Sequence, residues 1–152
     1  MRPAAGTAAL GLLLALVAGT FDAEPLYVAA VAFVALAAVA CGWVWLAARG
    51  VKVTRTLGAR RVVEEEPLDV RVHVRTGPVG VPGGVVCDEM LPRDFDLPIG
   101  RRGRRVLVHA RFARRGRRAL DPPEVVIRDP FGLATRVVRG TGHDELLVLP
   151  RI

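Results

Sequence analysis

Two charge-free apolar runs near the start of the sequence limit what this chain can fold into more than any other feature. The first extends from Ala4 to Thr20, and the second extends from Pro25 to Ala48, only four residues later. A helix that crosses a bilayer core needs about 20 apolar residues, with a range of roughly 17 to 25. The two runs therefore predict a transmembrane helical hairpin within residues 1–50, with helices at about 4–20 and 25–48.

The first run has an alternative interpretation as a signal peptide, since Arg2 precedes an apolar stretch that ends in small residues. However, no clean small-x-small cleavage site precedes Asp22, and the second apolar run follows almost at once. We therefore favour the hairpin. Tyr27 near one end of the second run, and Trp43 and Trp45 near the other, fit the aromatic belts of the two membrane interfaces.

Charges on the short flanks predict the orientation of the hairpin. The loop between the runs carries Asp22 and Glu24 and no base, whereas five bases follow the second run: Arg49, Lys52, Arg55, Arg60 and Arg61. An excess of Lys and Arg marks the cytoplasmic side. We therefore expect a multi-pass protein of the cell membrane, with both termini and the following domain in the cytoplasm. Cys41 and Cys87 suggest no disulfide framework, which is compatible with this location.

From residue 51 onward, the sequence changes to short segments in which apolar and polar residues alternate. In Leu68–Arg75, for example, Val70, Val72 and Val74 fall on one face of a strand. Gly- and Pro-rich breaks separate seven such segments, at residues 51–57, 68–75, 84–91, 105–112, 124–128, 134–138 and 145–149. This pattern predicts a mainly-β chain in which residues 51–152 form an antiparallel, immunoglobulin-like β-sandwich behind the hairpin.

A turn is predicted between the fifth and sixth of these strands. Asp129 can accept a backbone hydrogen bond, Pro130 presets its own φ near the value that the position after Asp129 needs, and Gly132 stands where type I turns favour glycine. We expect Asp129 to Gly132 to form a tight turn. Turn chemistry does not explain Phe131, which we expect to fold back over the apolar edge of the core. The alternative is that Phe131 docks the turn against another surface.

No motif in the sequence predicts catalysis or ligand binding. His73, His109 and His143 lie far apart and lack metal-ligand spacing, and Glu64 to Glu66 are expected to form a charged loop. The segment GPVGVPGG lacks the Lys-Ser/Thr end and the following helix that phosphate binding needs. We therefore expect no catalytic residue, no metal and no cofactor, and a protein that is not an enzyme.

Nine arginines and no acid occur between Arg101 and Arg118, in a chain whose formal net charge is +7. One interpretation is a solvated face of loops and strand ends. The leading functional interpretation is attraction to anionic lipid headgroups, to which each base near the surface contributes about 1 kcal/mol. Nucleic acid is not a favoured partner, because no aromatic residues are interleaved to stack bases. The candidate interaction surface comprises Arg101, Arg102, Arg104, Arg105, Arg114, Arg115, Arg117, Arg118 and Phe131.

The last forty residues resemble the family known as domain of unknown function 58. Three features carry the resemblance: Arg115-Gly116 entering a strand, the Asp-Pro-Phe-Gly-Leu turn from Asp129 to Leu133, and the apolar strand from Leu146 that ends in Pro150-Arg151. Members of this family typically have two transmembrane helices before such a β-rich segment. After it they have a region similar to a von Willebrand A domain, and this sequence stops where that region is expected to begin. The resemblance implies a membrane-bound accessory of a MoxR-type AAA+ ATPase.

Two functions from different classes remain open. In the first, the chain is a non-catalytic anchor and scaffold within a membrane-associated assembly. In the second, it is an exported, adhesin-like or envelope β-sandwich. Cleavage of the first apolar run discriminates between them, because an uncleaved run favours the anchor.

Overall fold

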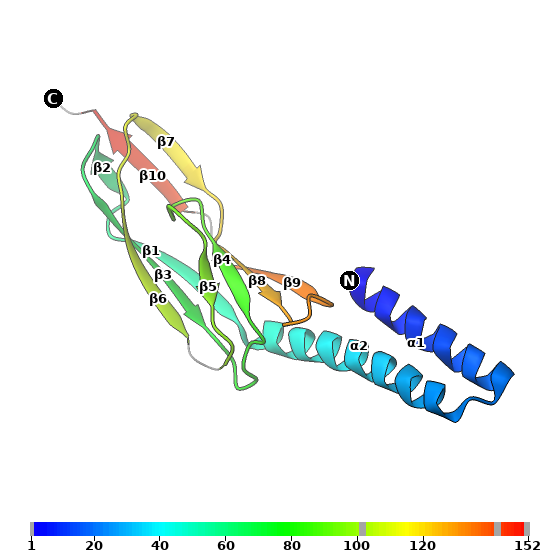
Figure 1. Ribbon diagram of the computed structural model, residues 1–152. Helices are drawn as coiled ribbons and strands as arrows, with labels where there is room; N and C mark the ends of the chain where they lie inside the picture. The colour runs from blue at the N-terminus through cyan, green and yellow to red at the C-terminus, as the bar shows by residue number, and fades with distance from the viewer. Residues whose placement is uncertain (1, 101–102, 142–143, 151–152) are drawn as a thin grey trace.

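The computed structural model describes residues 2–100, 103–141 and 144–150, and it shows a helical hairpin that projects from one end of a β domain (Figure 1). Helix α1 comprises Arg2–Phe21 and helix α2 comprises Glu24–Gly50. Both helices are long and apolar enough to cross a membrane. The two predicted helices are confirmed, and each begins and ends within two residues of the predicted bounds.

The chain reverses between the helices over a very short connection. Asp22 has a φ of 49°, and Asp is one of the few residues with a side chain that adopts this left-handed conformation readily. Pro25 then stands in the first turn of α2, where its missing N–H costs no helical hydrogen bond. The two helices pack closely at Gly11 of α1, because a Cβ atom at this position would lie 2.9 Å from the carbonyl oxygen of Ala30 in α2.

Helix α2 continues past the start of α1 and becomes part of the β domain. Its 27 residues exceed the 20 of α1, which at about 1.5 Å per residue makes α2 longer by about 10 Å. Val44, Ala47 and Ala48 near its C-terminal end are buried in the same apolar core as the strands. The hairpin is therefore joined to the β domain by a packed helix and not by a flexible linker.

Ten strands form three sheets in the described part of the chain. The first sheet has the order β1-β3-β6, the second β2-β10-β7 and the third β5-β4-β8-β9. Neighbouring strands are antiparallel, apart from β2 and β10, which pair in parallel. The strands are β1 Lys52–Leu57, β2 Arg61–Val63, β3 Leu68–Arg75, β4 Gly84–Cys87, β5 Phe95–Leu97, β6 Arg104–Ala110, β7 Gly116–Leu120, β8 Glu124–Arg128, β9 Thr135–Arg139 and β10 Asp144–Leu149.

A single apolar core joins the three sheets. The alternating valines of β3 are fully buried, as the period of two predicts. Val125 and Ile127 of β8, and Leu146 and Val148 of β10, belong to the same cluster. All seven predicted segments contain a strand, whereas β2, β5 and β7 were not predicted. The mainly antiparallel β architecture behind an apolar hairpin is therefore confirmed.

Candidate functional site

The structure divides the arginine cluster between the two ends of the β domain. Arg104 begins β6 and lies at the end of the domain near the hairpin. It pairs with Val74 at the end of β3, and Val74 lies beside the start of β1, which directly follows α2. By contrast, β7 with Arg117 and Arg118 lies at the end of the domain far from the hairpin (Figure 1). Arg101 and Arg102 lie outside the described residues.

The individual arginines of the cluster also differ in their contacts. Arg104 donates to the carbonyl oxygen of Asp96 at 2.8 Å, and the guanidinium of Arg118 stacks over Phe112 with 5.3 Å to the ring centroid. The side chains of Arg105, Arg114, Arg115 and Arg117 are exposed. Arg104 and Arg118 are therefore held by contacts within the chain, although both residues are also exposed.

Distance from the hairpin weakens the headgroup interpretation for the arginines of residues 114–118. The β domain extends between this segment and the two apolar helices (Figure 1). At physiological ionic strength, charges separated by more than about 8 Å are largely screened. These four bases therefore face a soluble partner more readily than the membrane in which the hairpin would lie.

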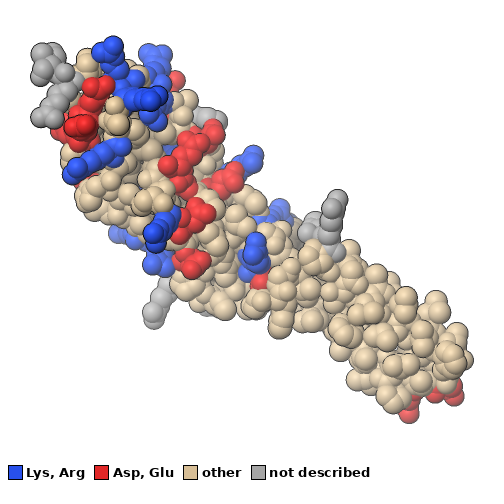
Figure 2. Space-filling model, turned by 45° about the horizontal axis from the view of Figure 1, so that its top comes forward, with Lys and Arg blue, Asp and Glu red and all other residues tan. Residues whose placement is uncertain are grey.

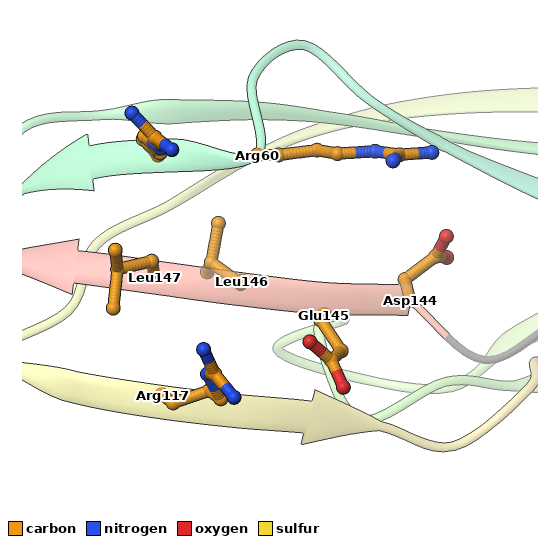
Figure 3. Close-up of a pocket in the computed structure, with 7 residues that line it drawn as sticks. Arg60, Arg117, Asp144, Glu145, Leu146 and Leu147 are labelled. Atoms are coloured by element: carbon orange, nitrogen blue, oxygen red, sulfur yellow. The ribbon is translucent and has the colours of Figure 1, made fainter.

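The sheet at this far end carries a groove of about 360 Å³. In the pairing register, Leu147 of β10 lies opposite Arg61 of β2 on one side and Arg117 of β7 on the other. Figure 3 shows Arg60 and Asp144 on one side of β10, and Arg117 and Glu145 on the other. The groove is lined by Arg60, Arg61, Arg117, Asp144, Glu145, Leu146 and Leu147.

The charges of this groove favour an acidic ligand. Three arginines outnumber the two carboxylates of the lining, Asp144 and Glu145, and Asp144 already accepts a hydrogen bond from Arg55 at 3.0 Å. Within the described ranges, Arg60, Arg61 and Arg117 form no ion pair with a carboxylate. Guanidinium groups present several donors in a planar fork that matches a carboxylate. The groove can therefore accept carboxylates from outside the chain, beside an apolar contact on Leu147.

A buried arginine fixes the wall of the groove. The Nε atom of Arg55 contacts Asp144, its Nη1 atom lies 3.2 Å from Asp88, and its Nη2 atom donates to the carbonyl oxygen of Leu120 at 3.4 Å. The side chains of Arg55 and Asp88 are fully buried. The charge pattern of the sequence identifies Arg55 only as a base of the hairpin flank. Its position in phase with Val53 and Leu57 was the signal that it faces inward.

The predicted turn has a defined hydrogen-bond network. The N–H of Gly132 donates to the carbonyl oxygen of Asp129 at 3.0 Å, so Pro130 and Phe131 are the two central residues of the turn, and Gly132 has a φ of +69°. The buried carboxylate of Asp129 accepts from the N–H groups of Phe131 at 3.0 Å and Ala134 at 2.6 Å.

The expectation that Phe131 folds back over the core is wrong. Its side chain is 71% exposed. The Asp129 carboxylate takes the inner side of the turn and holds the backbone N–H of Phe131, which leaves the ring outside.

No cluster of three or more His, Cys, Asp or Glu that could hold a metal is found in the described part of the chain. His109 lies 2.7 Å from Asp69 on an exposed face, His73 belongs to β3 at a distance from that pair in the register, and His143 is outside the described residues. No protein-family model and no curated protein matches this chain. The resemblance to domain of unknown function 58 therefore stays a prediction.

Proposed function

We propose that this chain is a non-catalytic, membrane-anchored adaptor that binds an acidic segment of a protein partner in the groove of β2, β10 and β7. The observation that carries the proposal is the position of Arg60, Arg61 and Arg117. These three bases gather, without ion pairs to described carboxylates, on the sheet farthest from the hairpin (Figures 1 and 3). A site held away from the bilayer is accessible to a soluble protein.

The distribution of charge supports an anchoring role for the hairpin. On the face shown in Figure 2, the outer part of the hairpin is uncharged apart from acidic side chains at its tip, and the other charged side chains lie on the β domain and where the hairpin joins it. Leu12, Leu13 and Leu16 of α1 are at least 60% exposed, which suits lipid and not water. Because α2 packs into the core, the hairpin fixes the orientation of the groove as well as its location.

We also propose that the β domain is an immunoglobulin-like sandwich and that it lies in the cytoplasm. An immunoglobulin-like sandwich is supported by the core that the three sheets share. A cytoplasmic β domain is supported by the bases that follow α2 against the acids Asp22 and Glu24 of the hairpin loop. The resemblance to domain of unknown function 58 makes a MoxR-type AAA+ ATPase the first protein partner to test.

An exported β-sandwich is the second candidate, because the first apolar run has features of a signal peptide. One contact opposes it. The N–H of Ala4 in α1 donates to the carbonyl oxygen of Leu133 beside the β8–β9 turn, at 3.1 Å. Cleavage after the first run would remove this contact, so the arrangement favours an uncleaved α1.

Binding of a Glu-rich peptide by the full chain in nanodiscs of zwitterionic lipid tests the adaptor function. Reversing both Arg61 and Arg117 to Glu should weaken binding by at least about tenfold, since a hydrogen bond to a charged group is worth about 1.5–3 kcal/mol. The matched control reverses Arg71 and Arg111, which are exposed outside the groove. Equal losses in the two double variants, or no binding by the unaltered chain, would refute the groove. The two double variants are then compared in a pull-down of a MoxR-type ATPase.

A further inference from the structure

We infer that the hairpin-side end of the β domain enters the headgroup region of the bilayer, with Phe131 and Ile99 as apolar anchors. This inference rests on the proposed membrane anchoring by α1 and α2. It assigns the exposed Phe131 ring, which turn chemistry does not explain, to a contact with lipid. The occupant is the same membrane that the hairpin crosses.

The length of α1 places the membrane boundary beside the β8–β9 turn. The apolar span Pro3–Phe21 has 19 residues, or about 28 Å at about 1.5 Å per residue, which matches a hydrocarbon core about 30 Å thick. One end of the core therefore lies near Phe21 and the other near Ala4. Because Ala4 donates to the carbonyl oxygen of Leu133, the turn that carries Phe131 is held at this boundary.

Helix α2 holds a second loop close to the same boundary. The indole Nε1 of Trp43 donates to the carbonyl oxygen of Gly80, in the loop between β3 and β4, at 2.8 Å. Tryptophan prefers the membrane interface, where its ring contacts apolar chains and its N–H finds a polar partner. Gly80 is linked in turn to the segment of Ile99, since Val81 and Gly100 exchange backbone hydrogen bonds at 2.8 and 2.9 Å.

The loop and the turn form one continuous patch. A hollow of about 280 Å³ is lined by Pro82 and Ile99 from the loops and by Pro130 from the turn. Ile99 is 66% exposed, and Phe131 follows Pro130 directly with its ring 71% exposed. Two large apolar side chains are therefore presented to solvent at the level of the membrane boundary.

Charge at this patch also suits a bilayer surface. Arg128 lines the hollow with an exposed side chain that can meet a lipid phosphate. The acid that lines the hollow, Asp129, is 3% exposed and is bonded to the N–H groups of Phe131 and Ala134. Apolar anchors beside a base, with the neighbouring acid turned inward, are typical of an interfacial membrane contact.

Spin-label depth measurements on the full chain in nanodiscs test the inference. Single labels are placed at Phe131→Cys and Ile99→Cys, in a background in which Cys41 and Cys87 are replaced by Ala. We expect both labels to collide more with membrane-dissolved oxygen than with a water-soluble nickel chelate. A label at Leu107→Cys, on exposed β6, should show the reverse.

A label at Leu13→Cys separates this inference from the anchoring on which it rests. Leu13 is 60% exposed in the middle of α1 and reports insertion of the hairpin alone. If Leu13 contacts lipid while Phe131 and Ile99 behave like Leu107, anchoring stands and the inference is overturned. If Leu13 also behaves like Leu107, both fail. If the Phe131 label is shielded from oxygen and nickel alike, protein covers the patch and the lipid assignment is overturned.

Discussion

The guanidinium of Arg55 and the carboxylate of Asp88 lie 3.2 Å apart, and both side chains are fully buried. This pair joins β1 of the first sheet to the segment that follows β4 of the third. Through Asp144 and the carbonyl oxygen of Leu120, Arg55 also reaches β10 and β7 of the second sheet. One side chain therefore links all three sheets and fixes the carboxylate at the edge of the arginine-lined groove.

Replacement of Asp88 by Asn should destabilise the β domain by about 3–5 kcal/mol, because it leaves a buried arginine with an incomplete set of acceptors. The measurement is urea unfolding of the full chain in detergent micelles, followed by tryptophan fluorescence, since the indole of Trp43 is bonded to the β domain.

The matched control is Glu124→Gln, which breaks the ion pair with Arg139 at 2.7 Å. The side chain of Glu124 is 36% exposed and that of Arg139 is 74% exposed. The control should therefore lower the free energy of unfolding by less than about 1 kcal/mol. Similar losses in the two variants would show that the Arg55 network does not hold the sheets together.

The backbone at Gly132 leads to a second prediction. At a φ of +69°, a β-branched residue is strained, and Gly132→Val should cost roughly 1–2 kcal/mol. A Cβ at this position meets no atom within 4 Å, so the cost is one of backbone conformation and not of a clash. Gly132→Asn should cost less, since Asn tolerates the left-handed region. Equal urea midpoints for the three proteins would contradict the turn assignment.

The thiol of Cys87 gives a third prediction. Burial raises the pKa of Cys87, and a hydrogen bond to Asp94, with the charges of Asp94 and Glu124, raises this pKa further. Since only the thiolate reacts, alkylation should still accelerate above the ordinary thiol pKa of about 8.5. In a Cys41→Ala background, Asp94→Asn should lower the pKa of Cys87. The profile of alkylation rate against pH should therefore move to lower pH.

Asp121→Asn is the control for this prediction, because Asp121 is an exposed acid that is not among the causes of the shift. Its alkylation profile should match that of the parent protein. If the Asp94→Asn profile also coincides with that of the parent protein, Asp94 does not set the reactivity of this thiol.

The sequence predicts those elements in which one physical effect dominates. Two uninterrupted apolar runs could only become apolar helices, and the alternation in Leu68–Arg75 could only bury one face of a strand. Strand β7 has no such pattern, because in Gly116–Leu120 only Leu120 is buried. Strands β2 and β5 have three residues each, too short for a period to appear. These three segments form strands because they pair with neighbouring strands, and not because of a pattern in their own residues.

The candidate site was harder to predict, since it depends on tertiary placement. Nine arginines within 18 positions predict a basic surface, but only the fold separates Arg104 from Arg117 along the length of the domain. Arg60 and Arg61 join Arg117 across the sheet from a distant part of the sequence. The exposure of Phe131 likewise follows from the inward position of the Asp129 carboxylate, which the sequence alone does not specify.

Topology mapping in cells tests most directly the claim that the hairpin anchors the β domain at the cytoplasmic face. Alkaline phosphatase folds to its active form only outside the cytoplasm, where its disulfides form. A fusion after Arg151 should therefore be inactive, and an insertion beside Asp22, between the two helices, should be active. The reverse pattern, an active fusion after Arg151 with an inactive one at Asp22, would contradict the account and favour an exported β domain.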